Sequence, residues 1–237
     1  MAENIYETDQ YWLKHPSMDE EDAAFKASNA IKLVREYDLH PTSILDVGCG
    51  SGKITYLFAR EFDVPTIGLD ISPAAIAHAK ATYKHDKLSF DLLPVGQYPS
   101  MASLGLMFNV LENIDDYIGF LRKNSYKADY WIFNIPLKMN ALNIIRAMEI
   151  HNRDHWGNLH YFSEKSALAT LEYCGYQIVD STLAITVLHS LKRKASIKPV
   201  IAALPRLLLM TLNRSIGVRI LGGATLFVLA KSNCDSI

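Results

Sequence analysis

The sequence predicts an α/β protein with a doubly wound, mostly parallel sheet, and three observations support this fold class. Predicted strands and helices alternate through the first 135 residues, the order that builds a parallel sheet with helices on both faces. The predicted strands are nearly continuous apolar runs, as expected where both faces of a strand are buried. A glycine-rich turn, "GCGSG" at 48–52, joins the first strand to the helix after it.

The helices follow from apolar spacing and from capping residues. Within residues 21–38, apolar residues recur at steps of three and four, so one helical face can be buried. Ser72 is a suitable N-cap with Pro73 in the first helical position. Ser163 and Gly175 are expected to begin and end a later helix. The predicted helices are residues 21–38, 53–62, 72–83, 114–124 and 163–176.

Seven short apolar segments have the character of strands. Pro136 ends the fifth of them, because proline cannot donate to a sheet ladder. The last two flank an insert rich in proline and leucine. The predicted strands are residues 43–48, 65–70, 87–93, 103–111, 128–136, 176–188 and 224–231.

Composition bounds the class of protein. The chain has 237 residues, of which 49% are hydrophobic and 21% charged, enough for one large domain with a full core. No apolar run reaches the roughly eighteen residues of a transmembrane helix. The N-terminal "MAENIYETDQ" has no apolar signal-peptide core, so we expect a cytoplasmic protein. Cys49, Cys174 and Cys234 are odd in number and far apart, so neither a disulfide framework nor a CxxC metal site is expected.

Charge is unevenly distributed along the chain, although the net charge is only −1. Seven acids fall between Glu3 and Asp22. The stretch from Ser181 to Cys234 contains no acid and eight bases. These bases are Lys192, Arg193, Lys194, Lys198, Arg206, Arg214, Arg219 and Lys231. A segment of one sign creates a local positive field that attracts anionic partners.

The glycine turn indicates a site for a ligand close to the main chain. Gly48, Gly50 and Gly52 permit positive φ and remove the Cβ atoms that would obstruct a ligand. The helix that follows directs free N–H groups toward the same place. Dinucleotide sites use the spacing GxGxxG, but here the spacing is GxGxG and Lys53 stands where the third glycine belongs. Asp70 ends the next strand, where a carboxylate can accept hydrogen bonds from both hydroxyls of a ribose.

The stretch "ILDVGCGSGKIT", followed by "GLDIS" and "FNVLENIDD", resembles the class I S-adenosylmethionine-dependent methyltransferases. The resemblance implies a Rossmann-like doubly wound sheet of seven strands, an antiparallel last strand and a helical insert before it. It also implies S-adenosyl-L-methionine as the cofactor, with the glycine turn beside its methionine part and Asp70 on its ribose. Ile71 would lie against the adenine, and Asp91 would cap the adenine amine. The implied cofactor-binding residues are Asp46, Gly48, Cys49, Gly50, Gly52, Asp70, Ile71, Asp91 and Asn109.

Two departures from the family pattern concern the fourth strand. Asn113 stands where histidine is common, and the acid that usually opens this strand is missing from "MASLGLM". Asn109 would face the methyl group, or would be a turn residue that ends the strand. The Asn/Asp-Pro-Pro-aromatic segment of nucleobase-methylating enzymes is absent, since Val110 and Leu111 follow Asn109. With no basic RNA-binding domain either, a nucleic acid acceptor is not expected.

A histidine cluster is the candidate source of a general base. "HNRDHWGNLHYFS" contains His151, His155 and His160, and a histidine of near-neutral pKa suits proton removal from an acceptor. We expect His155 or His160 to be the catalytic base, with Asp154 orienting a ring. The alternative is that these rings only pack within a loop, which Gly157 favours. No metal site is expected, because spacings of four and five do not bring three rings to one helical face.

The acid-free insert has three interpretations. It is a lid over the acceptor pocket that binds an anionic substrate, a helical cover over the sheet, or a surface helix that touches anionic lipid. Pro199 and Pro205 interrupt any long amphipathic helix, which counts against the last.

We therefore expect one domain, built from an N-terminal helical cap (1–40), a cofactor-binding core (41–135), an acceptor-pocket loop (136–162) and the basic helical insert (188–222). The expected activity is methyl transfer from S-adenosylmethionine to a small-molecule acceptor, with O-methylation of a glycan, lipid or secondary metabolite as the leading interpretation. N- or C-methylation, or a non-catalytic scaffold of the same fold, are the alternatives. A nicotinamide oxidoreductase is disfavoured by Lys53. A homodimer is left open.

Overall fold

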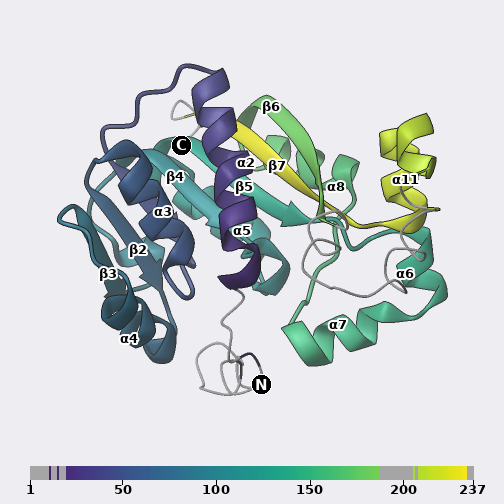
Figure 1. Ribbon diagram of the computed structural model, residues 1–237, viewed down its shortest axis with the longest axis horizontal. Coiled ribbons are helices and arrows are strands. Elements are labelled where there is room, and N and C mark those ends of the chain that lie inside the picture. The colour runs from purple at the N-terminus through teal and green to yellow at the C-terminus, as the bar shows by residue number, and fades with distance from the viewer. Residues whose placement is uncertain (1–10, 12–14, 16–19, 187–204, 206–207, 234–237) are drawn as a thin grey trace.

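The computed structural model describes residues 11, 15, 20–186, 205 and 208–233 of the chain. Its centre is a seven-stranded sheet in the order β3-β2-β1-β4-β5-β7-β6. The ribbon in Figure 1 shows this sheet crossing the molecule, with the C-terminal strand β7 lying between β5 and β6. The strands are β1 (Ile44–Val47), β2 (Thr66–Asp70), β3 (Leu88–Leu92), β4 (Ala102–Phe108), β5 (Ala128–Pro136), β6 (Tyr176–Ile185) and β7 (Ala224–Ser232).

Strand direction confirms the predicted topology. β1 pairs in parallel with β2 and β4, β2 with β3, and β4 with β5. β7 is antiparallel to both β5 and β6, so six strands run one way and the last strand runs against them. The seven-stranded, doubly wound sheet with an antiparallel last strand is therefore confirmed.

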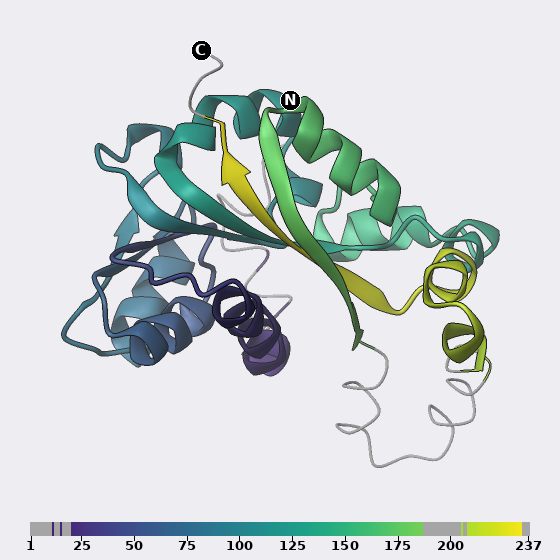
Figure 2. The same cartoon turned by 90° about the horizontal axis from the view of Figure 1, so that it is seen from above.

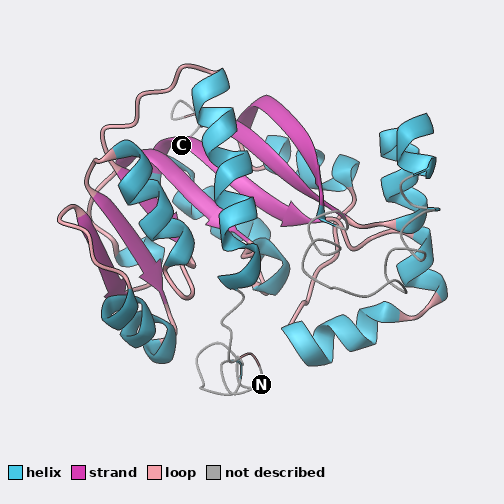
Figure 3. Cartoon of the chain, in the orientation of Figure 1, coloured by secondary structure: helices cyan, strands magenta, loops and turns pink. Residues whose placement is uncertain are grey.

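Helices cover both faces of the sheet, as the cartoon in Figure 3 and the turned view in Figure 2 show. One face packs against α2 and α3 through a core that includes Phe58, Leu104 and Ile132. The other packs against α5 and α8 through Trp131 and Phe133. The helices are α2 (Ala23–Glu36), α3 (Lys53–Phe62), α4 (Pro73–Thr82), α5 (Tyr117–Asn124), α6 (Ala141–Ile145), α7 (Met148–Trp156), α8 (Glu164–Tyr173) and α11 (Arg214–Leu221).

Two predicted caps hold the flanking helices. The side chain of Ser72 accepts a hydrogen bond from the backbone amide of Ala75, with Pro73 in the first turn of α4. Ser163 and Ser166 form a capping box at the start of α8. Both helix starts were expected from the sequence.

Two sequence expectations differ from the structure. The fourth strand ends at Phe108 rather than near residue 111, because Asn109 adopts φ +57° and the chain turns into the short 3-10 helix Leu111–Asn113. The segment 136–162, expected to be a loop, contains helices α6 and α7, and Gly157 ends α7 in a left-handed conformation. Most of the insert 188–222 lies outside the described residues; its described part holds helical residues 208–212 and α11.

Register places the ends of the parallel strands at one level. Val47 of β1 is opposite Leu69 of β2 and Met107 of β4, and Phe108 is opposite Asn134 of β5. The residues that follow these strands therefore emerge together at one edge of the sheet. In open α/β sheets this edge is where ligands bind.

Candidate functional site

A cavity of about 940 Å³ lies at this edge of the sheet. The glycine turn after β1 and the end of β2 form one part of its wall. Residues that follow β4 and β5, with the start of β7, form the other part. The volume is that of a site for a drug-sized ligand.

The glycine turn depends on backbone conformations that favour glycine. Gly48, Gly50 and Gly52 have φ values of +70°, +52° and +80°. The amides of Gly48 and Cys49 both donate to the carbonyl of Leu69, at 2.8 and 3.0 Å, so the turn is fixed to the end of β2. Gly48, Cys49 and Gly50, three of the residues expected to bind the cofactor, line the cavity. Gly52 is absent from the lining and instead begins α3.

Asp70 joins the turn to the next helix. Its Oδ2 accepts from the amide of Gly50 at 2.8 Å, and its Oδ1 accepts from the amide of Ser72 at 2.9 Å. Burial raises the pKa of Asp70, while these backbone amides act in the opposite direction. A carboxylate oxygen can accept two hydrogen bonds, so both oxygens keep the capacity to accept from a ligand diol. Asp70 and the adjacent Ile71, which were expected to contact the ribose and the adenine, both line the cavity.

Asp46 also lines the cavity, but its carboxylate serves the fold as well. Its Oδ2 accepts from the Thr55 hydroxyl at 2.7 Å, which links β1 to α3. Burial raises the pKa of Asp46 to about 7, against the opposing effect of that hydrogen bond. The carboxyl group therefore titrates near neutrality.

Asp91, predicted to cap an adenine amine, lies outside the cavity lining. It is exposed on β3 and its Oδ1 lies 3.8 Å from the Lys80 amine. The pleat of β3 turns this side chain outward, whereas the segment Leu93–Gly96 after the strand reaches the cavity. Asn124, at the end of α5, lines the same region, and its buried Oδ1 has no hydrogen-bond partner in the structure.

Glu112 is a functional candidate that the sequence analysis did not single out. Its side chain is buried in the cavity wall and Oε2 has no hydrogen-bond partner. Burial raises the pKa of Glu112 to about 7, although Lys138 and Lys26 favour the charged form. The carbonyl of Glu112 accepts from the amides of Leu159 and His160, at 2.7 and 3.0 Å, which fixes its backbone. Its place in "VLEN", shortly after the fourth strand, was the sequence feature that could have marked it as a candidate for the site.

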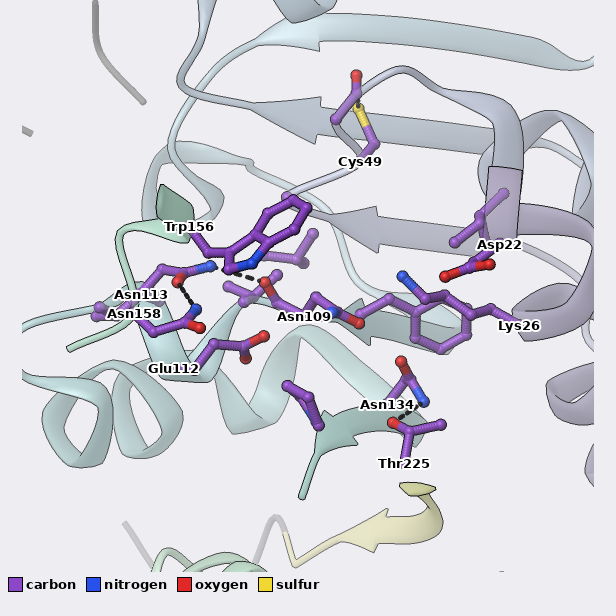
Figure 4. Close-up of a pocket in the computed structure, with 18 of the residues that line it drawn as sticks. Asp22, Lys26, Cys49, Asn109, Glu112, Asn113, Asn134, Trp156, Asn158 and Thr225 are labelled. Atoms are coloured by element: carbon purple, nitrogen blue, oxygen red, sulfur yellow. Dashed lines mark hydrogen bonds between the residues drawn. The ribbon is translucent and has the colours of Figure 1, made fainter. Parts of the chain in front are cut away.

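Amide side chains surround the same space, as the close-up in Figure 4 shows for Asn109, Asn113, Asn134 and Asn158. Asn109 lines the cavity and is also the turn residue that ends β4. Its backbone N–H donates to the backbone carbonyl of Asn134 at 3.0 Å. The Asn134 side chain donates to the Thr225 hydroxyl at 2.8 Å. In both asparagines the buried Oδ1 has no partner.

The orphan atoms share one chemical character. Among the described residues, the buried side-chain atoms without a hydrogen-bond partner are Asn109 Oδ1, Glu112 Oε2, Asn124 Oδ1 and Asn134 Oδ1. All four residues line the cavity. Buried polar atoms in native proteins are nearly always paired, so the cavity is built for a ligand that supplies hydrogen-bond donors.

Asn113, which stands where the resembled family has histidine, belongs to a connected polar wall. Its Nδ2 donates to the Asn109 carbonyl at 2.9 Å, and its Oδ1 accepts from Asn158 at 2.8 Å. The Lys138 amine donates to the side-chain Oδ1 of Asn158. This chain of contacts fixes the residues after β4 against those after β5.

The structure does not bring the predicted bases His155 and His160 into the cavity lining. The Nε2 atom of His160 lies 2.9 Å from the carbonyl of Ile114, so the ring tethers the loop after β4. His155 is exposed on α7, and its carbonyl lies 2.9 Å from the Nε2 atom of His15. The His155 ring lies against the Trp156 ring at a centroid distance of 4.6 Å, within helix α7, which takes the place of the expected loop.

In the ranges that the structure describes, no group of three or more His, Cys, Asp or Glu side chains is arranged to hold a metal ion. Over those same ranges, no helix has the length and apolarity needed to cross a bilayer.

Comparison with known proteins agrees with this geometry. Residues 44–106 match a family model described as a methyltransferase domain. The magnesium protoporphyrin IX methyltransferase from Synechocystis PCC 6803, solved with bound SAH, is 14% identical with a TM-score of 0.60, over 91% of this chain and 84% of that one. The N-methyltransferase NodS from Bradyrhizobium japonicum WM9, solved in complex with S-adenosyl-L-homocysteine, is 13% identical with a TM-score of 0.61. The match covers 98% of this chain and 100% of NodS.

A third similar structure is the cyclopropane synthase MmaA2 from Mycobacterium tuberculosis, at 13% identity and a TM-score of 0.56, over 80% of this chain and 78% of that one. The named activities of the three proteins differ. At these identities the likeness establishes the shared fold, and the site must indicate the acceptor.

Proposed function

We propose that this chain is a class I S-adenosylmethionine-dependent methyltransferase and that it methylates a small molecule. The family match of residues 44–106 and the shared fold support this class. The observation that carries the proposal is the unit formed by the glycine turn and Asp70, which faces a cavity lined by unsatisfied acceptor oxygens. The cavity offers room for an acceptor beside a nucleoside ligand.

The residues present fit S-adenosyl-L-methionine. Asp70 would accept from the ribose hydroxyls and Ile71 would pack against the base, since both line the cavity. The orphan Oδ1 of Asn124, near Gly96, would accept from the exocyclic amine in the role first expected of Asp91. The orphan Oδ1 of Asn109 accepts from an ammonium group near the glycine turn. When bound, the cofactor would supply a methyl group on a sulfonium: the bond from the methyl carbon to an acceptor atom forms as the bond to sulfur breaks, and a neutral thioether leaves.

Glu112 is the proposed proton acceptor in place of His155 and His160. Its carboxylate lies in the cavity wall, and its pKa of about 7 suits a base that works near neutral pH. An acceptor hydroxyl would give its proton to Glu112 while its oxygen bonds to the methyl carbon. Asn134 would orient the methyl-accepting substrate, because its orphan Oδ1 can accept a hydrogen bond from a second hydroxyl of that substrate.

An acceptor with several hydroxyl groups is the substrate class that this lining supports, in agreement with the sequence-based expectation of a glycan, lipid or secondary metabolite. Hydroxyl groups are donors, and the unsatisfied atoms of the cavity are all acceptors. Lys26 and Lys138 in the lining allow an acceptor that also carries an anionic group. A substrate amine could donate hydrogen bonds to the same unpaired oxygens, so N-methylation is the second candidate.

Calorimetric titration of the full chain with S-adenosylmethionine and with S-adenosylhomocysteine tests the proposal. Saturable binding of both is expected. No heat at millimolar ligand would overturn it and would favour a non-catalytic scaffold. Incubation with methyl-labelled S-adenosylmethionine and a set of sugars, phenols and amines, read by mass spectrometry, then identifies the atom that is methylated. A nicotinamide cofactor should bind to neither wild type nor variants.

A further inference from the structure

Thr225, at the start of β7, lines the cavity beside Asn134 of β5. The register places Thr225 opposite Pro136, so Asn134 and Thr225 are diagonal neighbours on one face of the paired strands. Asn134 is 1% exposed and Thr225 is 4% exposed. Figure 4 shows the hydrogen bond that joins the two side chains. The pair is therefore shielded from water, and its hydrogen bonds depend on the protein and on a bound ligand.

The Thr225 hydroxyl fixes which atom of the Asn134 amide is left for a ligand. This hydroxyl has one proton, which it donates to the backbone carbonyl of Ile135 at 3.0 Å. Toward Asn134 the hydroxyl can then only accept, and it accepts from Nδ2 at 2.8 Å. Because Thr225 holds Nδ2, the buried Oδ1 of Asn134 remains without a partner in the cavity wall. A rotated amide would bring two oxygens together at Thr225 and lose a hydrogen bond.

Asn124 shows the same arrangement in another part of the cavity wall. Its Nδ2 donates to the backbone carbonyl of Phe120 at 2.8 Å, and its buried Oδ1 has no partner. A carbonyl oxygen can only accept, so this amide is also held with its oxygen unpaired. Two asparagines from different elements thus present an oxygen because the protein occupies their nitrogen. The acceptor character of the wall is therefore set by the fold before a ligand binds.

We propose that Thr225 is a positioning residue that makes the cavity select a substrate with a hydrogen-bond donor beside Asn134. This inference rests on the proposed function, in which Asn134 contacts the methyl-accepting substrate. A hydroxyl at that point pairs with Oδ1, whereas its methyl ether leaves the buried oxygen unpaired. Sites built to bind a hydroxyl discriminate strongly against analogues that lack it. The protein therefore acts on its substrate before the hydroxyl beside Asn134 is itself methylated.

Catechol and its dimethyl ether, 1,2-dimethoxybenzene, are the probes, because rings of Phe25, Phe108 and Trp156 also line the cavity. NMR titration of the full chain, saturated with S-adenosylhomocysteine, measures both affinities. Wild type should bind catechol more tightly than the ether by on the order of tenfold. Thr225→Val keeps the shape of the side chain but frees the Asn134 amide to rotate, so this ratio should fall about fivefold. Thr225→Ser restores the hydroxyl and should restore the ratio.

Thr66→Val is the matched control. Thr66 lies on β2, is 3% exposed, and donates its hydroxyl proton to the carbonyl of Val64 at 2.8 Å, but it lies outside the cavity lining. Each valine variant loses one buried hydroxyl that is bonded to a backbone carbonyl, so urea unfolding should show similar losses of stability. Only Thr225→Val should change the ratio of the two affinities, which a purely structural role would leave as it is in wild type.

The inference is overturned by an unchanged ratio in Thr225→Val, by an equal fall in Thr66→Val, or by a Thr225→Ser variant that behaves like Thr225→Val. Equal binding of the two probes by wild type, or no binding of catechol, would also overturn it. Calorimetric titration of wild type with S-adenosylhomocysteine alone separates this result from the proposed function. If that ligand binds and the probe experiment fails, only the role of Thr225 is refuted, whereas absence of cofactor binding would refute both.

Discussion

The Oδ2 atom of Asp70 accepts a hydrogen bond from the backbone amide of Gly50 at 2.8 Å, so the acid that ends β2 and the glycine turn after β1 form one unit. The Leu69 carbonyl completes the unit by accepting from the amides of Gly48 and Cys49. Because three hydrogen bonds fix the turn, the position of the carboxylate at the cavity is set by the backbone. The unit is preorganised for a ligand that needs an acceptor beside a bare main chain.

Asp70→Ala should weaken binding of S-adenosylmethionine by about 2 kcal/mol, or roughly thirtyfold, because charge-assisted hydrogen bonds to the ribose are lost. Titration calorimetry measures the change. The control is Asp91→Ala, which removes an exposed acid outside the cavity lining and should leave the affinity unchanged. Unchanged affinity in Asp70→Ala would refute the ribose assignment, and a loss in Asp91→Ala would restore the original role of that acid.

Gly52→Ala should destabilise the fold more than Gly175→Ala. Both glycines have positive φ, +80° and +92°, so both substitutions introduce backbone strain of about 1 kcal/mol. At Gly52 the new Cβ would also lie 2.7 Å from Ala79 and from Phe90, whereas at Gly175 nothing lies within 4 Å. Urea unfolding of the two variants measures the difference. Equal midpoints would mean that the close packing of α3 against α4 and β3 has little energetic weight.

The sheet could be predicted from the sequence because apolar runs and turn residues are local signals. Ser72 and Ser163 cap their helices as expected, since a cap needs only the first residues of a helix. The helix over 148–156 was missed because its hydrophobic pattern is weak: of its nine residues, only Asn152 is buried. Its packing comes from distant residues such as His15, whose ring stacks on Trp156 at a centroid distance of 4.4 Å.

The turn side of the site could be predicted and the acceptor side could not. Gly48, Gly50 and Asp70 are adjacent to strand ends, so the parallel sheet itself brings them together. Glu112 becomes notable only through its burial and its unpaired Oε2, which depend on contacts with residues after β5. Asn124 reaches the cavity from the far end of α5, a placement that no local motif encodes.

Asn124→Leu should abolish the preference of the protein for an adenine over a hypoxanthine base. The orphan Oδ1 of Asn124 can accept from the adenine amine, which inosine derivatives lack. Wild type should bind S-adenosylhomocysteine about tenfold more tightly than S-inosylhomocysteine, since one hydrogen bond at a buried site is worth about 1.4 kcal/mol. In the variant the two affinities should converge. A preference that persists would place the amine elsewhere.

Glu112→Gln should lower turnover by on the order of a hundredfold, since general bases contribute that much or more. Wild-type turnover should rise with pH through about 7, where Glu112 loses its proton, and the variant should lack this rise. Methyl transfer to the acceptor found by labelling is the measurement. His155→Ala should retain nearly wild-type turnover, because that side chain lies outside the cavity lining. The reverse result, a large loss in His155→Ala alone, would return the role of base to the histidine.

Glu112 should also make the fold less stable as pH rises. Burial raises the pKa of Glu112 from an ordinary 4.5 to about 7, so between these values the folded chain holds a proton that the unfolded chain has lost. The free energy of unfolding therefore falls with rising pH, by about 1.4 kcal/mol per unit from this group, or on the order of 3 kcal/mol in total. Asp46 and Asp70, whose pKa values are also raised, act in the same direction.

The difference between wild type and Glu112→Gln isolates this contribution, because the amide keeps the shape of the side chain and does not titrate. Urea unfolding from pH 5 to pH 8 should show a shallower decline in the variant, which should gain on wild type as the pH rises. Glu36→Gln, at an exposed ion pair with Lys32, should follow the wild-type curve. If the free energy of unfolding fell with pH in parallel for wild type and Glu112→Gln, Glu112 would ionise at its ordinary pKa. That result would contradict its proposed role as the base of the reaction.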